Sequence, residues 1–235
     1  MGLDLLGGVL VSAPMALVAW RMRAVTRGGA AAGFFCALAI YLGAYLAGIA
    51  VLGVALLLTE LTSRLGRTRK AQLGIAQERG GQRGAANVIA NCLVGAVAGL
   101  LTAFSLPWSG EAGALMLVTA IAAGASDTVA SEVGKAFGGQ PRAFPSFRLV
   151  SPGEPGAISA VGTIAGVLAA AVIAWPAVAL WLLPADRVPL IVGACTIAAF
   201  VESALATRFE SRGLLDNNAL NLLNTACAAA LVLLW

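Results

Sequence analysis

The sequence predicts an all-α, polytopic integral membrane protein: a helical bundle of about eight transmembrane helices, with seven as the alternative. Of its 235 residues, 60% are hydrophobic and only 11% are charged, whereas soluble domains carry about 25% charged residues. The mean hydropathy is +0.90, and 28 glycines accompany the Ala, Leu and Val that dominate the chain. This composition is typical of closely packed membrane helices. It excludes a water-soluble globule and predicts a single transmembrane domain over residues 1–235.

Apolar stretches of membrane-crossing length follow one another along the whole chain. A membrane helix needs about 20 apolar residues, and we predict spans at 3–20, 28–43, 44–63, 86–106, 112–130, 157–183, 187–207 and 217–235. The run from Gly28 to Thr59 has 32 uncharged residues, too many for one crossing, so we divide it near Gly43. Pro176 lies inside the long sixth stretch, which predicts either a kinked helix or a helix followed by an interfacial segment.

The basic residues predict which side of the membrane each loop faces. Lys and Arg accumulate on the cytoplasmic side, and eight spans with an outside N-terminus place 14 of the 15 basic residues there. These are Arg21, Arg23, Arg27, Arg64, Arg67, Arg69, Lys70, Arg79, Arg83, Lys135, Arg142, Arg148, Arg208 and Arg212, and Arg187 falls outside. We therefore expect a multi-pass protein of the cell inner membrane. Both termini should lie outside, and the polar segments 64–85 and 135–156 should form a site at the cytoplasmic surface.

The composition also narrows the chemistry. The chain has no histidine, so an imidazole base, zinc ligand or proton relay is excluded, and Asp, Glu, Lys, Arg and Asn must carry any reaction. The four cysteines each stand alone in an apolar stretch, which favours core packing over a disulfide or metal centre. The arginines are not interleaved with aromatic residues, so we expect no nucleic-acid partner.

The segment 124–139 contains the strongest candidate site. Asp127 and Glu132 lie at the end of a predicted span, where carboxylates are functional candidates because their burial is unfavourable. Helical spacing of 3, 4 and 4 residues places four residues on one face of this helix: Asp127, Ala130, Gly134 and Gly138. Two interpretations of this face are open. Its small residues can let a neighbouring helix approach closely, or a nucleotide can lie against them while Asp127 and Glu132 hold Mg²⁺ through oxygen.

Residues next to these carboxylates fit a phosphate ligand. Lys135 lies one turn after Glu132 and can either pair with it or reach a phosphate. The sequence Gly138-Gly139-Gln140-Pro141-Arg142 breaks the helix and offers free amides together with Arg142 as an oxyanion cradle.

The inside loop at 64–85 adds further cations. Lys70 and Arg79 are either anchors to anionic lipid headgroups or ligands of the donor or acceptor phosphates. Asn87 and Asn91 follow at i, i+4 in the next span, where they can bind neighbouring helices or line a polar pocket.

A last polar cluster surrounds the start of the final span. Asp216 is interpreted first as a helix N-cap. After it, a stripe at i, i+4 and i+7 contains Asn217, Asn221 and Asn224, with Asn218 beside it. We expect this stripe to face the same cavity as Asp127, with Asp216 or Glu202 as a second ligand of a metal or of phosphate-bound water.

Several of these motifs resemble those of known membrane families. The spacing Asp127-x-x-Ala130-x-x-x-Gly134-x-x-x-Gly138 resembles the nucleotide-binding pattern of the CTP-dependent polyprenol kinases. A closer resemblance is to the membrane family containing phytyl-phosphate kinase and transmembrane protein 19. The motifs that carry it are Ser126-Asp127-Thr128, Ala130-Ser131-Glu132-Val133-Gly134 and Gly139-Gln140-Pro141-Arg142. Further stretches that fit are Lys70-Ala71 through Arg79-Gly80-Gly81 to Asn91, Ser151-Pro152-Gly153-Glu154-Pro155-Gly156 with Ser159, and Glu202-Ser203 through Leu215-Asp216-Asn217-Asn218 to Asn221. The chain departs from that family at Val129, usually aromatic, and at Glu202, usually Asp.

The resemblance implies a kinase that phosphorylates an isoprenyl monophosphate, such as phytyl or geranylgeranyl phosphate, to the diphosphate. CTP is the implied donor and Mg²⁺ the implied cofactor. The predicted catalytic residues are Asp127, Glu132 and Lys135. The predicted nucleotide and phosphate ligands are Ser126, Ala130, Ser131, Gly134, Gly138, Arg142, Lys70, Arg79 and Asn91. The predicted metal ligands are Asp127, Glu132, Glu202 and Asp216, and the remaining polar pocket residues are Asn87, Asn217, Asn218 and Asn221.

The residues agree with this chemistry independently of the resemblance. Phosphoryl transfer depends mostly on positioning and charge neutralisation, and an acceptor phosphate is already anionic near neutral pH, so a chain without histidine can catalyse it. No Walker A loop is present, because Val129 occupies the position of its first glycine and Ala136 follows Lys135. Two alternatives stay open: a cytidylyltransferase that makes a CDP-lipid, and a transporter of lipids or small molecules.

Overall fold

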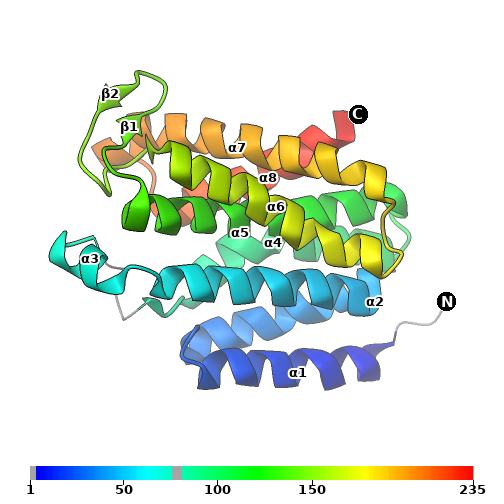
Figure 1. The fold of residues 1–235 in the computed structure, drawn as a ribbon. Coiled ribbons are helices and arrows are strands. Elements are labelled where there is room, and N and C mark those ends of the chain that lie inside the picture. Colours follow the sequence, from blue (N-terminus) through cyan, green and yellow to red (C-terminus); the bar gives the residue numbers. More distant parts are fainter. Residues whose placement is uncertain (1–3, 76–80, 235) are drawn as a thin grey trace.

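The computed structural model describes residues 4–75 and 81–234, in which closely packed helices run along a common direction (Figure 1). The helices are α1 (Leu5–Arg21), α2 (Arg27–Arg64), α3 (Arg67–Gln72), α4 (Ala85–Ala103), α5 (Glu111–Phe137), α6 (Ala160–Ala179), α7 (Val188–Phe209) and α8 (Asn217–Leu231). Short 3₁₀ turns are η2 (Ala185–Arg187), η3 (Glu210–Arg212) and η4 (Val232–Leu234). The predicted all-α membrane bundle is confirmed.

Helix α2 is a hairpin of two membrane segments. Its backbone leaves helical geometry at Tyr45 (φ 47°, ψ −140°), two residues from the division predicted near Gly43. A straight helix of 38 residues would be about 57 Å long. Yet Thr26, which precedes the helix, and Thr59, near its end, both hydrogen-bond to Arg83, at 3.0 and 2.9 Å. The chain therefore reverses at Tyr45 (Figure 1).

The number of crossings agrees with the prediction. Six helices of the described chain are long and apolar enough to cross a membrane, and α1 is a shorter apolar helix of 17 residues. Because α2 supplies two crossings, the described segments form eight. The predicted stretch 157–183 is one helix, α6, which contains Pro176 near its end and is followed by a turn that begins at Leu180.

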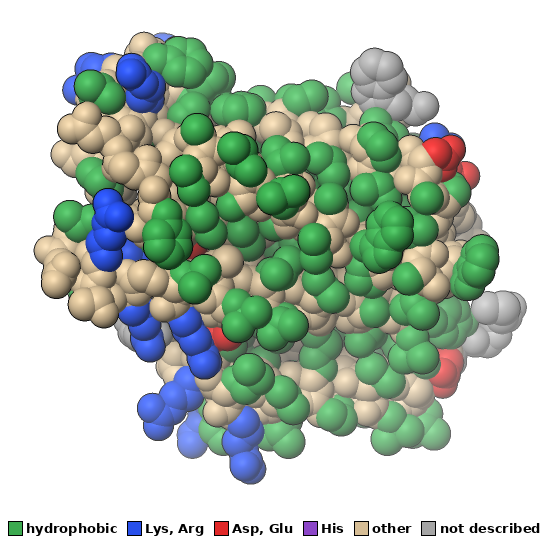
Figure 2. All heavy atoms as spheres, in the orientation of Figure 1, with side chains coloured by type: hydrophobic (Ala, Val, Ile, Leu, Met, Phe, Trp, Pro, Cys, Tyr) green, Lys and Arg blue, Asp and Glu red, His purple; other side chains and the backbone are tan. Residues whose placement is uncertain are grey.

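Helix α5 is the most enclosed element. Within an apolar stretch of 18 residues of α5, 78% of the residues are buried, against 28 to 39% in the corresponding stretches of the other candidate spans. It packs against α2, α4, α6, α7 and α8. By contrast, Ile164, Leu168 and Trp175 of α6 are 58 to 61% exposed, and hydrophobic side chains cover the middle of the molecule (Figure 2). Polar side chains on α5 therefore face protein, whereas the outer helix faces meet the bilayer.

The two ends of the bundle differ in charge. Lys and Arg gather at the end that carries α3, and Asp and Glu are visible at the opposite end (Figure 2). We call the first the basic end; its described connections are 22–26, 65–75 with 81–84, 138–159 and 210–216. Arg187 lies at the opposite end, as predicted, and its Nε donates to Glu111 at 2.7 Å. The start of α1 and the end of α8 also lie at that opposite end (Figure 1).

A small antiparallel sheet, which the sequence did not predict, organises the connection between α5 and α6. Its strands are β1 (Arg142–Ala143), β2 (Arg148–Leu149) and β3 (Ala157–Ile158), in the order β2-β1-β3. Phe144, directly after β1, packs on Phe200 of α7 with ring centroids 5.1 Å apart. The sheet thereby holds the connection against α7 at the basic end.

Candidate functional site

A cavity of about 270 Å³ lies between α5, α6 and α7 at the basic end, where residues 152–158 cover one side. We call it the acidic cavity. Eight of the predicted site residues line it: Ser126, Asp127, Ala130, Ser131, Gly134, Lys135, Glu202 and Asn217. They come from three different helices, so the fold brings together two of the sequence clusters, the one on α5 and the one around Glu202.

Two carboxyl groups face each other inside the acidic cavity. Asp127 extends from α5 and Glu202 from α7, both side chains line this cavity, and the two groups interact electrostatically. Glu202 is 8% exposed, and its Oε2 has no hydrogen-bond partner among the described residues. Neighbouring carboxylates repel when both are charged. The pair is therefore unfavourable unless a proton or a cation lies between its members.

This pair fits a hard divalent cation. Mg²⁺ takes oxygen ligands, and proteins commonly hold it with one or two carboxylates while substrate phosphates and water complete the shell. In the part of the chain that the structure describes, no three His, Cys, Asp or Glu side chains meet at one point. Asp127 and Glu202 would hold such an ion. Of the four predicted metal ligands, these are the two that the fold brings together.

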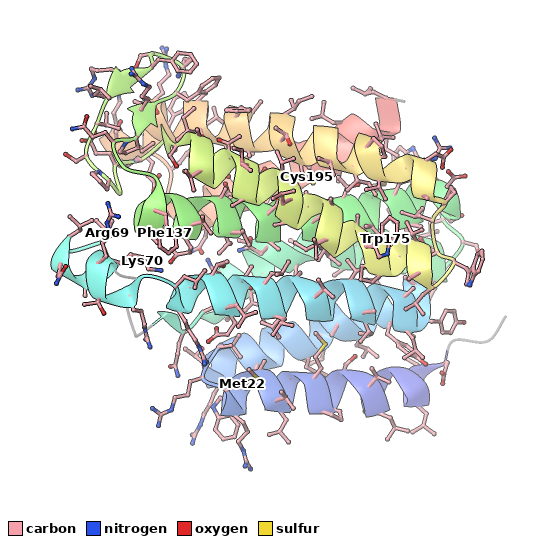
Figure 3. All side chains as sticks on the ribbon, in the orientation of Figure 1. Met22, Arg69, Lys70, Phe137, Trp175 and Cys195 are labelled. Atoms are coloured by element: carbon pink, nitrogen blue, oxygen red, sulfur yellow. The ribbon has the colours of Figure 1, made fainter. Side chains whose placement is uncertain are left out.

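Glu132 belongs to a separate ion-pair cluster. Its Oε2 accepts from Lys70 Nζ at 2.6 Å, and its Oε1 accepts from Lys135 Nζ at 3.4 Å. Lys70 Nζ also donates to the Ser63 carbonyl at 2.9 Å, and the side chains of Lys70 and Glu132 are both 2% exposed. In Figure 3, Lys70 lies between α3 and the basic end of α5. The structure therefore uses Glu132 to attach α3 to α5 and does not place it with Asp127.

The small-residue face of α5 packs against α6. A Cβ atom added at Gly162 would lie 2.5 Å from the Ala130 carbonyl oxygen, and one at Gly134 would lie 3.0 Å from Ser159 Oγ. Helices this close need residues without large side chains. The close approach of α6 agrees with the helix-packing interpretation of this face, and the nucleotide interpretation stays a prediction. Ala130 and Gly134 also line the acidic cavity.

The predicted asparagines divide between different contacts. Asn217 lines the acidic cavity. Asn218 instead accepts from Asn87 Nδ2 at 3.5 Å, and Asn91 Nδ2 donates to the Asn87 carbonyl at 2.9 Å. Asn221 is buried within the bundle. Asn224 Nδ2 donates to the Ala123 carbonyl of α5 at 3.4 Å, so the polar stripe of α8 mainly joins α8 to its neighbouring helices.

Asp216 has the first of its two predicted roles. Its Oδ1 accepts from the Ala219 N–H at 2.8 Å, and the residue is the N-cap of α8. Of the described residues that line the acidic cavity, the nearest in sequence is Asn217. Asp216 itself is not among the residues that line the acidic cavity, and its role as a metal ligand stays a prediction.

The remaining predicted phosphate ligands are spread over the basic end. Arg142 is exposed in β1, and its Nη1 donates to the Phe147 carbonyl at 2.8 Å. Gly138 ends α5 in contact with Ser159. Arg79 lies outside the described residues. The glycine turn and Arg142 therefore do not reach the acidic cavity, whereas the side chain of Lys135, 27% exposed, does.

Two sets of residues escaped the sequence prediction. Thr163 of α6 and Thr196 and Ser203 of α7 line the acidic cavity, but hydroxyls in helices usually bond their own backbone, so nothing in the sequence distinguishes them. Arg83 was grouped only with the loop cations. The available signal was Asn87, a polar residue four positions later at the start of a span, which lines the same second cavity described below.

These features define a polytopic membrane protein in which acidic side chains from two spans meet at the basic end of the bundle. The model of the integral membrane protein family DUF92 matches residues 10–229, and the chain belongs to that family. This match confirms the family resemblance inferred from the motifs.

The relatives come from bacteria, archaea and plants. The chain is 34% identical over 173 residues to the uncharacterized membrane protein sll0875 of Synechocystis sp., covering 73% of this chain and 67% of that protein. It is 33% identical over 171 residues to the uncharacterized membrane protein MJ0933 of Methanocaldococcus jannaschii, covering 72% and 68%. The chloroplastic protein VTE6 of Arabidopsis thaliana is 28% identical over 193 residues, covering 80% of this chain and 58% of VTE6. No solved structure matches the chain.

Proposed function

We propose that this protein is a Mg²⁺-dependent phosphotransferase that converts an isoprenyl monophosphate, such as phytyl or geranylgeranyl phosphate, into the diphosphate, with CTP as donor. The observation that carries the proposal is the meeting of Asp127 and Glu202 in a cavity that Lys135 also lines. Two carboxylates fit Mg²⁺, and a nearby ammonium fits a phosphate. The motif resemblance supports the choice of prenyl phosphate and CTP.

The composition of the cavity wall supports an amphiphilic substrate. Toward the basic end the wall is formed by residues 152–158 and Glu210. Farther along the helices it contains Val167, Cys195 and Ala199, and Cys195 lies near the middle of α7 (Figure 3). The phosphate groups therefore belong at the basic end, and the prenyl chain belongs between α6 and α7 toward the middle of the bilayer.

The reaction needs little proton transfer. An oxygen of the acceptor phosphate bonds to the γ-phosphorus of CTP, and the bond from that phosphorus to the β,γ-bridging oxygen breaks, releasing CDP and the isoprenyl diphosphate. That acceptor oxygen is already anionic, so no side chain must act as a strong base. Asp127 and Glu202 hold the cation, and Lys135 neutralises phosphate charge. When bound, Mg²⁺ supplies charge neutralisation at the donor phosphate oxygens.

The proposal includes an orientation in the membrane. Basic residues face the cytoplasm in membrane proteins, so the basic end is the cytoplasmic end and both termini lie outside, in the cell inner membrane. The acidic cavity then lies on the side where nucleotides are available. Labelling of single cysteines placed at each end of the bundle in intact cells tests this orientation.

The decisive experiment is a substrate panel with the purified protein. Mg²⁺, one of several nucleoside triphosphates, and phytyl or geranylgeranyl phosphate are supplied, and the products are weighed by mass spectrometry. A prenyl diphosphate with CDP is expected. A CDP-lipid with pyrophosphate would show cytidylyl transfer, and uptake into proteoliposomes without nucleotide turnover would show a transporter.

A matched pair of variants tests the site. Asp127→Ala should abolish diphosphate formation, because it removes one of the two facing carboxylates. Glu111→Gln should leave the reaction unchanged, because Glu111 lies at the opposite end of the bundle with its side chain 51% exposed. A fully active Asp127→Ala protein would contradict the site while leaving the fold intact.

A further inference from the structure

A second cavity lies across α5 from the acidic cavity. It has a volume of about 110 Å³ and is lined by residues of α1, α2, α4 and α5. Gly124 and Thr128 of α5 line it, whereas Ser126 and Asp127 line the acidic cavity. Helix α5 therefore separates the two spaces. We call the second one the Arg83 cavity, and the proposed reaction makes no use of it.

The Arg83 cavity is polar at one end and apolar along the rest. Near the basic end its wall includes Arg83, Thr59 and Asn87, and farther into the bundle it includes Ala37 and Leu52. The lining along α2 extends from Leu52 to Thr59, about 10 Å at 1.5 Å per residue. A cavity with a polar end and an apolar remainder is complementary to a molecule with one polar end and one apolar chain.

The fold holds the Arg83 guanidinium in place. The Arg83 N–H donates to the Ala24 carbonyl and its own carbonyl accepts from the Thr26 N–H, both at 3.0 Å. Its Nη1 donates to Thr59 Oγ1 at 2.9 Å. Its Nη2 is buried and has no hydrogen-bond partner among the described residues. Burial lowers the pKa of Arg83 below its ordinary value, because the charged guanidinium has lost hydration.

The carboxylates that attract this guanidinium are already bonded to other cations. Glu60 and Glu132 exert the attraction on Arg83. Glu60 Oε1 lies 2.6 Å from Arg64 Nη2, and Glu132 Oε2 lies 2.6 Å from Lys70 Nζ. A buried cation without a close counter-charge is strongly unfavourable. An anion in the cavity would supply both the charge and the missing acceptor.

Two amides narrow the identity of that anion. Asn87 and Asn91 lie one turn apart on α4 and line the same cavity, and within the described chain the Oδ1 atoms of both are buried without hydrogen-bond partners. These oxygens require a donor. A phosphate monoester carrying one proton offers several acceptors for Arg83 together with one hydroxyl donor for an amide, whereas a carboxylate offers acceptors alone.

We infer that the Arg83 cavity is a binding site for a single-chain lipid phosphate, with its phosphate on Arg83, Asn87 and Asn91 and its chain along α2 toward the middle of the bilayer. Its volume of about 110 Å³, less than half that of the acidic cavity, favours one chain over two. Because α5 separates this phosphate from Asp127, the site is distinct from the acceptor position of the proposed reaction. It stands or falls independently of that reaction.

Photoaffinity labelling tests the inference with the full-length protein in detergent, without Mg²⁺ or nucleotide. The probe is geranylgeranyl phosphate that carries a diazirine on its chain, and the labelled peptides are identified by mass spectrometry. Labelling of α1, α2 or α4 is expected. Phytyl phosphate should compete at least tenfold better than phytol, inorganic phosphate or the two-chain phosphatidate. Equal competition by phosphatidate would overturn the single-chain assignment, and equal competition by phytol would overturn the phosphate site.

Two variants and a control locate the site. Arg83→Gln should remove the preference for phytyl phosphate over phytol. Gly33→Leu should block labelling by filling the cavity, because the nearest atom to an added Cβ there is Val88 Cγ1 at 3.9 Å. Gly53→Leu makes the same change elsewhere on α2, where an added Cβ meets nothing within 4 Å, and should leave labelling intact.

The outcomes separate this inference from the proposed function. Labelling that survives both Arg83→Gln and Gly33→Leu would overturn the Arg83 site even if the protein makes prenyl diphosphates. Site-specific labelling that those variants remove would support it even if no nucleotide is consumed. A wild-type melting temperature of Arg83→Gln in detergent would show that the variant is folded and that the loss of labelling is local.

Discussion

Asp127 and Glu132 lie five residues apart on α5, yet their surroundings are opposite. Glu132 is bonded to Lys70 and Lys135, whereas Asp127 faces a second carboxyl group, that of Glu202. The protein itself supplies the counter-charge of Glu132. Asp127 and Glu202 instead need a shared proton or a bound cation to relieve their repulsion. The comparison teaches that burial alone does not mark a functional acid in a membrane helix; the charge of its partner does.

Helix geometry explains why the two acids separate. Five residues correspond to about 140° around an α-helix axis, so Asp127 and Glu132 point toward different neighbouring helices. Glu132 meets Lys70 of the short helix α3, and Asp127 meets α7. The two acids are close in sequence, but they contact different parts of the bundle. Their shared sequence motif does not reveal this separation.

The largest expected effect is on activity and concerns the facing carboxyl groups of Asp127 and Glu202. Glu202→Gln removes one charge from the facing pair, and we expect prenyl phosphate phosphorylation to fall about 10³-fold, equivalent to about 4 kcal/mol of transition-state stabilisation. The folded protein should persist, because the substitution relieves repulsion between carboxylates. Turnover with saturating Mg²⁺ and CTP measures the loss. Activity within tenfold of wild type would show that Asp127 acts without Glu202.

The next prediction concerns the stability of the Glu132 cluster. Glu132→Gln leaves Lys70 buried without its carboxylate, and breaking a buried ion pair in this way lowers the free energy of unfolding by about 3–5 kcal/mol. The double variant Glu132→Gln with Lys70→Met removes both charges and should recover much of that loss. Thermal unfolding in detergent measures both. An unchanged melting temperature in the single variant would remove Glu132 from its structural role.

A third prediction separates the two acids by their response to metal. A ligand that binds only the folded state at 100 times its Kd stabilises it by about 2.7 kcal/mol. We expect Mg²⁺ to raise the melting temperature of the wild-type protein and of Glu111→Gln. The shift should be absent in Asp127→Asn. A shift that survives in Asp127→Asn would place the metal elsewhere.

Much of the fold was predictable, because hydropathy and charge act locally along the chain. The division of the long apolar run near Gly43 came within two residues of the break at Tyr45, since membrane thickness limits helix length. The site was predictable only in part. Asp127 and Glu202 are 75 residues apart in sequence, and their meeting depends on how α5 and α7 pack. The small face of α5 could bind a helix or a ligand, and the sequence did not show that Gly162 of α6 would approach this face closely.

The smallest expected effect tests a third acid, Asp216, whose two predicted roles make opposite demands on its side chain. As an N-cap, it can be replaced by Asn, because an amide oxygen accepts the Ala219 N–H equally well, whereas Ala removes the acceptor and lowers stability by about 1 kcal/mol. As a metal ligand, it could not lose its charge without loss of activity. We therefore expect Asp216→Asn to keep wild-type turnover and melting temperature, and Asp216→Ala to melt slightly lower with its turnover retained. If Asp216→Asn lost turnover as Glu202→Gln is expected to, the carboxylate of Asp216 would belong with the acids that need a ligand.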